Sequence, residues 1–227
     1  MTHLSQRVGK FSPRGLVLDM DGLMVDSEPL WFAVERAFAA ARGGDFTEAH
    51  ALACVGRGTA HTLRTMSELF GFPVDVARDT RAIMDAFLDR VAELQLKPGL
   101  VALLDDAVGA LPIAVASSSP LRLIHAVLDR FGLRARMDAI VSGESVASPK
   151  PAPDIFLKAA RDIGVEPASC AVFEDSLAGA TAGRAAGMFV IAVPEHAADG
   201  FAAVADRIVP DLFAARTALD LPPRRGV

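Results

Sequence analysis

The chain has 227 residues, of which 52% are hydrophobic and 22% are charged. This length and composition exclude a largely disordered protein, and they allow one large domain or one domain with a sizeable insertion. The net charge of -5, with no block of Lys and Arg to offset it, argues against nucleic acid as a partner.

The two cysteines, Cys54 and Cys170, lie in unrelated contexts and form no CxxC motif. This predicts neither a disulfide framework nor a thiolate metal site. The N-terminal segment has no apolar signal region, and the chain has no apolar run long enough to span a membrane. We therefore expect a cytoplasmic protein without a membrane partner. Because no coiled coil is apparent, we also expect a monomer.

Two carboxylates directly follow the first predicted strand. The strand is the apolar run Leu16-Val17-Leu18, typical of a strand buried on both faces. Asp19 and Asp21 share one face of an extended chain, and Gly22 allows a sharp turn after them. Such a pair can bind a hard divalent cation, and one acid can attack while the other moves protons. An ordinary turn explains the same spacing, so these residues alone leave both interpretations open.

The next part of the chain is predicted to be helical, and no strand candidate interrupts residues 28–96. Glu28 and Pro29 suit the first turn of a helix, and Gly43-Gly44 suits its end. Apolar residues recur at helical spacing in the two segments that follow. The predicted helices cover residues 28–42, 59–70 and 75–96.

The pattern changes at the turn signal Lys97-Pro98-Gly99, after which short apolar strands alternate with helices. The predicted helices are 100–109, 121–131, 154–163 and 177–186. The predicted strands are 113–116, 139–141, 171–173, 189–193 and 208–209. This alternation predicts an α/β fold, in which helices cover both sides of a parallel sheet and residues 28–96 form a helical insertion.

Polar residues follow four of the predicted strands. Parallel α/β sheets bind ligands beyond the carboxyl ends of their strands, so we expect these residues to meet at one edge. Each group differs in chemistry from the next. They are Asp19 and Asp21 after the first strand, Ser117, Ser118 and Ser119 after the second, Lys150 after the third, and Glu174, Asp175 and Ser176 after the fourth.

These groups have complementary roles if the substrate is a phosphate. Asp19 would be the nucleophile that forms an acyl phosphate. Asp21 would protonate the leaving oxygen and later deprotonate water. Asp175 would complete a cation site with Asp19 and the backbone carbonyl of Asp21, with Glu174 nearby or acting through water.

The remaining strand-end residues would bind the phosphate itself. Ser117 and the turn at Ser118 would hold phosphate oxygens, and Lys150, stiffened by a proline on each side, would neutralise their charge. We assign Ser119 instead to the N-cap of the following helix. One of the three residues from Glu174 to Ser176 is expected to cap the helix at 177–186.

Four segments together resemble the motifs of the haloacid dehalogenase-like hydrolase superfamily, in the branch with a helical cap inserted after the first motif. They are DMDGLMVDSEP, the strand end at Ser117, KPAPDIF from Lys150, and FEDSLAGATAGRAAGM from Phe173. The resemblance runs from about Gly15 to Val193, with the motifs in order. It implies a Rossmann-like three-layer core of residues 1–26 and 97–227 and a helical cap of residues 27–96.

The resemblance also implies a Mg²⁺-dependent mechanism through a phosphoaspartate, with the roles assigned above. Dehalogenases of the superfamily lack the second aspartate and the Mg²⁺ requirement, so Asp21 and Asp175 favour phosphate chemistry. Relatives that resemble β-phosphoglucomutase carry a histidine at the position of Trp31, where it helps to keep the general acid from water. Trp31 cannot act in the same way, which favours hydrolysis. The run DSEPLW is similar to sugar-phosphate phosphatases.

Substrate choice is expected to lie in the cap, because the core contacts only the phosphoryl group. The loop at residues 55–59 has glycines that allow close approach, and Arg57 could meet a hydroxyl or a second phosphate. Thr59 and His61 share this candidate role, although an exposed helical histidine is the alternative for His61. The cap is expected to hinge near Asp26-Ser27 and Lys97-Pro98-Gly99.

The sequence therefore predicts a Mg²⁺-dependent phosphatase of small phosphorylated metabolites, most of all sugar phosphates. A phosphomutase of the β-phosphoglucomutase type is the near alternative. From a different class, a signalling receiver also combines acids, a hydroxyl and a lysine around a phosphorylated aspartate. The spacing of Asp19 and Asp21 and the large insertion argue against it. A non-catalytic metabolite-binding protein is the last alternative.

Overall fold

The computed structural model describes residues 10–54, 57–195 and 199–222. Six strands form one sheet in the order β3-β2-β1-β4-β5-β6, and every neighbouring pair is parallel. This confirms the α/β fold, and the order is that of Rossmann-type sheets. The strands are β1 Gly15–Leu18, β2 Ile113–Ser117, β3 Ala139–Ser142, β4 Cys170–Glu174, β5 Phe189–Ala192 and β6 Arg207–Ile208.

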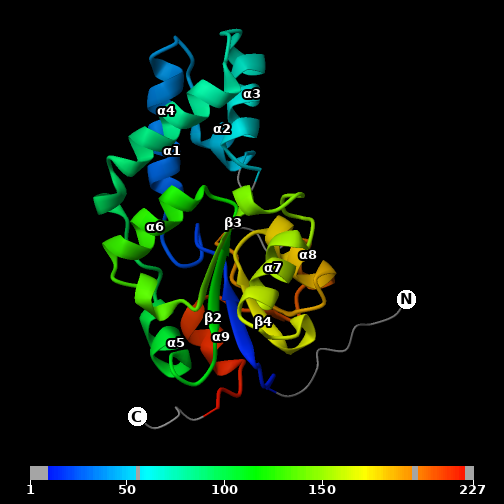
Figure 1. Ribbon diagram of the computed structural model, residues 1–227. Coiled ribbons are helices and arrows are strands. Elements are labelled where there is room, and N and C mark those ends of the chain that lie inside the picture. Colours follow the sequence, from blue (N-terminus) through cyan, green and yellow to red (C-terminus); the bar gives the residue numbers. More distant parts are fainter. Residues whose placement is uncertain (1–9, 55–56, 196–198, 223–227) are drawn as a thin grey trace.

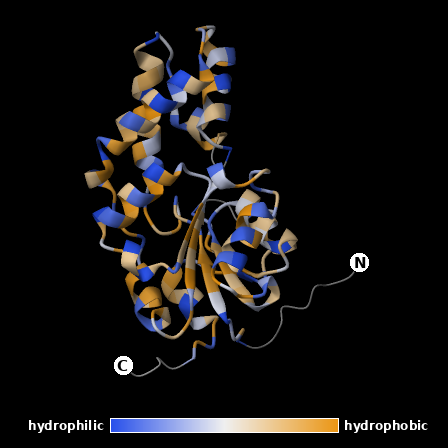
Figure 2. Ribbon diagram, viewed as in Figure 1, coloured by the Kyte–Doolittle hydropathy of each residue, from blue (hydrophilic) through white to orange (hydrophobic). Residues whose placement is uncertain are grey.

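Helices cover both faces of the sheet (Figure 1). On one face lie α5 (Leu100–Ala107), α6 (Leu121–Arg130) and α9 (Leu212–Thr217), and on the other lie α7 (Asp154–Asp162) and α8 (Leu177–Ala185). Strand β1 shows why three layers form. Its side chains alternate, so Leu16 and Leu18 join the core under the first set of helices while Val17 joins the core under the second. In Figure 2 the strands are mostly hydrophobic in colour, whereas the helices around them alternate between hydrophobic and hydrophilic residues.

The helical insertion, residues 27–96, stands beyond one end of the sheet (Figure 1). Its helices are α1 (Glu28–Ala40), α2 (Glu48–Leu52), α3 (Thr59–Phe70) and α4 (Val76–Leu88). A small core of its own holds Ala39, Phe46, Met66 and Phe72. Within the described residues, none of the helices is both long and apolar enough to cross a membrane.

One predicted helix was too long, and two helices were missed. The helix expected over 75–96 ends at Leu88, because the chain turns back toward the sheet and buries Leu94 in the main core. Helices α2 and α9 were not predicted, since both are short and carry little apolar periodicity. Short 3₁₀ turns also occur at Val91–Glu93, Arg134–Arg136, Gly143–Ser145, Pro167–Ser169 and Phe201–Ala203.

The chain enters and leaves the insertion through two backbone segments that lie side by side. Val25 and Leu96 form an antiparallel bridge. The amide of Lys97 donates to the carbonyl of Met24 at 2.9 Å, and the amide of Asp26 donates to the carbonyl of Gln95, also at 2.9 Å. The two linkers therefore run side by side at the carboxyl end of β1.

Candidate active site

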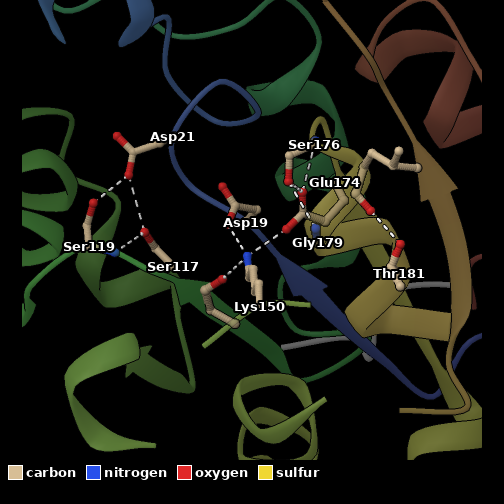
Figure 3. Close-up of polar contacts among 11 residues, drawn as sticks. Asp19, Asp21, Ser117, Ser119, Lys150, Glu174, Ser176, Gly179 and Thr181 are labelled. Atoms are coloured by element: carbon tan, nitrogen blue, oxygen red, sulfur yellow. Dashed lines mark hydrogen bonds and ion pairs between the residues drawn. The ribbon is translucent and has the colours of Figure 1, made fainter. Parts of the chain in front are cut away.

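The strand-end residues meet beside β1 and β4. The chain leaves β1 toward β2 on one side, whereas β4 joins β1 on the other, so this is the point where the strand order reverses. Ligands of open α/β sheets bind at such a point, beyond the carboxyl ends of the strands. Figure 3 shows Asp19, Asp21, Ser117, Lys150 and Glu174 brought together there.

Lys150 lies at the centre of the site and is almost fully buried. Its ammonium group contacts Oδ1 of Asp19, Oε1 of Glu174 at 2.6 Å and the carbonyl oxygen of Ala116 at 3.1 Å (Figure 3). Burial alone would lower the pKa of Lys150, but attraction to Asp19 and Glu174 outweighs burial and raises this pKa. The lysine is therefore held as a cation against the proposed nucleophile, where the sequence predicted a counter-charge for phosphate.

The negative charge of the acids around Asp19 exceeds the single positive charge of Lys150. Burial raises the pKa of Asp19 to about 8, attraction to Lys150 opposes this rise, and repulsion from Glu174 and Asp21 adds to it. Asp175 is in a similar position, because burial and then repulsion from Glu174 and Asp19 raise its pKa. Asp19, Asp175 and Glu174 thus share one ammonium group, and additional positive charge at this place would favour the ionised forms of Asp19 and Asp175.

The donor set suits a small hard cation. Asp175 lies against the backbone of Gly22, where a Cβ would come within 2.1 Å of its Oδ2 atom, and Gly22 also has a φ of +79°. Only glycine fits there, so the turn brings the Asp21–Gly22 backbone to the Asp175 carboxylate. Across the described residues, no three His, Cys, Asp or Glu side chains form a ready metal cluster. Mg²⁺ needs no such cluster, because it usually takes one or two carboxylates together with water and phosphate oxygens.

Asp21 points away from Asp19 and toward two serines (Figure 3). Its Oδ2 atom accepts hydrogen bonds from the hydroxyls of Ser117 at 3.2 Å and Ser119 at 2.7 Å. Its Oδ1 atom accepts one from Nε1 of Trp31 at 3.3 Å. Trp31 therefore does reach the predicted general acid, although an indole can only donate, whereas a histidine can also accept or carry charge.

Ser119 has a different role from the one its sequence position indicated. The residue before α6 is Pro120, and the Ser119 hydroxyl bonds to Asp21 instead of capping the helix. Ser142 fixes this turn by donating to the carbonyl of Ser119 at 2.7 Å. The cap prediction for Ser119 is therefore wrong, because an acceptor from another strand end competes with the helix for its hydroxyl.

Glu174 is held in place by donors on both of its oxygens. Lys150 binds Oε1, and the amide and hydroxyl of Ser176 bind Oε2 at 3.1 and 2.9 Å. Ser176 also caps α8 by accepting from the amide of Gly179, which confirms that one residue of this group caps the helix. Gly179 makes room for the acid, since a Cβ there would lie 1.7 Å from Oε1. Nothing in the sequence pattern had marked this glycine.

A cavity of about 700 Å³ lies between the strand ends and the helical insertion. Ser118, Arg57 and Thr59 line it, as expected of substrate-binding residues, whereas His61 is not among its lining residues in the described part of the chain. Val55 and Gly56 of the predicted loop lie outside the described residues. The sequence analysis had not marked Glu35 of α1, which also lines the cavity and is almost fully buried.

Comparison with known proteins identifies the family. Residues 13–187 match the family model described as haloacid dehalogenase-like hydrolase. The chain belongs to this family. It is 36% identical over 183 residues to fructose-1-phosphate phosphatase YqaB of Escherichia coli K12, covering 79% of this chain and 95% of that protein. It is 31% identical over 198 residues to hexitol phosphatase B of the same organism, covering 78% of this chain and 82% of that protein.

Solved structures agree with the fold. A mutant of CbbY from Rhodobacter sphaeroides in complex with xylulose-(1,5)bisphosphate is similar with a TM-score of 0.80 and 28% identity, covering 92% of this chain and all of that one. Because the chain belongs to a hydrolase family, it is an enzyme and not a signalling receiver or a non-catalytic binding protein. The resemblance inferred from the four motifs is thus confirmed.

Proposed function

We propose that this enzyme is a Mg²⁺-dependent phosphatase that hydrolyses small phosphorylated metabolites, sugar phosphates above all, through a phosphoaspartate on Asp19. The observation that carries the proposal is the pairing of buried Asp19 with Lys150 on the wall of the cavity, with Asp21 two residues further along. Similarity to fructose-1-phosphate and hexitol phosphatases supports the substrate class.

In the first step, a carboxylate oxygen of Asp19 attacks phosphorus, and the bond from phosphorus to the substrate's ester oxygen breaks. Asp21 gives its proton to that leaving oxygen, so the released product is an alcohol. Lys150 neutralises charge on the phosphoryl oxygens, and the Ser117 hydroxyl donates a hydrogen bond to one of them. Because Asp21 points toward Ser117 and Ser119 in the free enzyme, it must turn to reach the ester oxygen.

In the second step, water attacks the phosphorus of the acyl phosphate. Asp21 takes the proton from this water, and the bond between phosphorus and Asp19 breaks, which releases phosphate and restores the carboxylate. The enzyme thereby returns to its starting protonation state. General acid–base catalysis of this type typically contributes about 10²- to 10⁴-fold in rate.

The cation has a defined place in this proposal. Asp19, Asp175 and the backbone carbonyl of Asp21 would hold Mg²⁺, and Glu174 would support the site from the Lys150 side. When bound, Mg²⁺ neutralises charge on the phosphoryl oxygens and helps to orient them. The support is the excess of buried acids over ammonium groups at this point.

We assign residues 27–96 as a cap over a core of residues 1–26 and 97–227. The support is the cavity, whose wall combines Asp19 and Lys150 from the core with Trp31 and Arg57 from the insertion. The hinge segments are Asp26-Ser27 and Lys97-Pro98-Gly99. Closure of such a cap would keep bulk water from the reacting phosphate until the alcohol has left.

A phosphate-release screen over many phosphorylated metabolites, with and without Mg²⁺, tests the proposal. We expect Mg²⁺-dependent release from sugar phosphates and a loss of at least about 10³-fold in kcat for Asp19→Asn. Asp45→Asn, the same change at an exposed site on the insertion, serves as a matched control and should keep full activity. Full turnover by Asp19→Asn would refute the phosphoaspartate mechanism.

The same screen separates hydrolysis from mutase chemistry. β-Glucose 1-phosphate is incubated with its bisphosphate primer, and both free phosphate and sugar-phosphate isomers are measured. We expect free phosphate, because the indole of Trp31 contacts Asp21 only as a donor. Interconversion of isomers without phosphate release would instead assign a phosphomutase.

A further inference from the structure

The helical insertion contains a buried acid that is not required for phosphoryl transfer. Glu35 lies in α1, is 7% exposed, and lines the cavity. The other buried acid of the insertion, Asp79, has ion pairs with Arg78 and Arg42. Glu35 has no ion pair within the part of the chain that is described. Burying a carboxylate without a cation is unfavourable unless hydrogen bonds or a ligand compensate.

Two hydroxyls accompany Glu35 on the cavity wall. Thr62 of α3 is 3% exposed and hydrogen-bonds the Glu35 carboxyl. Thr80 of α4 also lines the cavity, and its buried Oγ1 atom has no hydrogen-bond partner among the described residues. Three separate helices thus each place one polar group on the wall. Unpaired buried hydroxyls are rare in folded proteins, so Thr80 indicates a partner that arrives with a ligand.

The position of this cluster along α1 relates it to the phosphate end of the site. Trp31, one helical turn before Glu35, donates a hydrogen bond to Asp21 and lines the same cavity. Four residues along a helix correspond to a rise of about 6 Å. A ligand whose phosphate lies at Asp19 and whose chain extends past Trp31 therefore reaches Glu35.

From this arrangement we propose that Glu35, Thr62 and Thr80 form a subsite for hydroxyl groups at the substrate end remote from the phosphate, selecting monophosphates of polyhydroxy chains. The subsite rests on the proposed phosphatase function, which places the phosphate at Asp19. An ionised Glu35 accepts hydrogen bonds from hydroxyls, and the Thr80 hydroxyl both donates and accepts.

The same chemistry rejects two other ligand classes. An alkyl chain without hydroxyls would leave Glu35 and Thr80 unpaired in a desolvated place, which discriminates strongly against it. A second phosphate at the remote end would be repelled by the ionised form of Glu35, because like charges would then lie together. The exposed Arg57 lies on the cavity wall as well, so a bisphosphate is the direct competitor in the test.

Binding to the full-length Asp19→Asn protein with Mg²⁺, measured by calorimetry, tests the subsite without turnover. The probes are sorbitol 6-phosphate, hexyl phosphate of equal carbon number, and fructose 1,6-bisphosphate. We expect sorbitol 6-phosphate to bind at least about tenfold more tightly than each of the others. Tighter binding of the bisphosphate, or no binding by any of the three, overturns the inference.

Substitution of the acid then identifies its role. Adding Glu35→Gln should weaken sorbitol 6-phosphate about tenfold, leave hexyl phosphate within about twofold, and tighten the bisphosphate. Thr80→Val, which keeps the shape, should weaken only sorbitol 6-phosphate, whereas Glu68→Gln at an exposed site of α3 should change nothing. Equal weakening of sorbitol and hexyl phosphates, or no effect of Glu35→Gln, overturns the subsite.

The two assays together distinguish failure of the subsite from failure of the proposed phosphatase function. If wild-type enzyme releases no phosphate from the metabolite panel but the binding differences hold, the subsite stands and the phosphatase assignment fails. If wild-type enzyme hydrolyses sugar phosphates but Glu35→Gln binds all three probes as before, the phosphatase assignment stands and the subsite fails.

Discussion

Glu35 should make the unliganded enzyme less stable as the pH rises. Burial raises the pKa of this carboxyl from 4.5 to about 7, and the hydrogen bond from Thr62 offsets only part of that rise. Between these two values the folded protein binds a proton that the unfolded chain has lost, so the free energy of unfolding falls with increasing pH. Below pH 4.5 both states are protonated, and above pH 8 the loss is nearly complete.

The size of the effect follows from the shift. One pKa unit corresponds to about 1.4 kcal/mol, so a change from 4.5 to about 7 amounts to about 3.4 kcal/mol in total, of which about 2.5 kcal/mol falls between pH 5 and pH 8. Glu35→Gln cannot ionise. Its free energy of unfolding, relative to wild type, should therefore increase by about 2.5 kcal/mol over this pH interval.

Urea unfolding of both proteins at pH 5, 6, 7 and 8, without Mg²⁺ or substrate, measures this difference directly. Taking the variant minus wild type cancels the titration of Asp19 and the other acids. For a chain of this size, the expected gain corresponds to about 5–10 °C in Tm. Glu68→Gln should show a difference that is flat with pH. A flat difference for Glu35→Gln as well would refute the reasoning.

Four further outcomes are expected. Trp31→Phe keeps an aromatic ring but loses the hydrogen bond to Asp21, so kcat should fall about tenfold with KM nearly unchanged in steady-state phosphate release; an unchanged kcat would show that the contact is incidental. Gly22→Ala would place a methyl group against Asp175 at a φ of +79°, so we expect loss of Mg²⁺-dependent activity and about 1–3 kcal/mol of stability in urea unfolding, and wild-type behaviour would contradict this. Lys150→Met leaves two buried carboxylates unpaired and should destabilise the protein by about 3–5 kcal/mol at pH 7, whereas equal stability would argue against the ion pairs. Mg²⁺ at about 100 times its Kd should stabilise wild type by about 2.7 kcal/mol in a thermal scan, reversibly with EDTA and not in Asp175→Asn; a shift retained in that variant would place the cation elsewhere.

The parts of the fold that are encoded locally could be predicted from the sequence. Apolar runs such as Leu16-Val17-Leu18 identify buried strands. The residues that directly follow such a run must lie at the carboxyl end of the strand. This is why the four groups of site residues were found and why they meet at one edge of the sheet. The helix over 75–96 was too long for the opposite reason, since its apolar periodicity continues through Leu94 although the backbone has turned.

Contacts between distant segments could not be predicted in this way. From the sequence, Ser119 has the position of a cap residue. In the structure its hydroxyl instead donates a hydrogen bond to Asp21, which is 98 positions away. Glu35 looks like a solvated helical acid, because its burial depends on where α3 and α4 place Thr62 and Thr80. For the same reason Trp31 could be marked as a departure from related proteins but not as a partner of Asp21.

The bridge between Val25 and Leu96 makes the insertion resemble the loop of a β-hairpin, however large that loop is. Its two attachment points are hydrogen-bonded neighbours, so a change in the length of the insertion leaves the backbone pairing of β1 in place, although residues such as Leu94 pack in the same core as β1. Under the proposed division into core and cap, the segment that selects the substrate is attached at a single place, separate from the strand ends that carry the proposed chemistry.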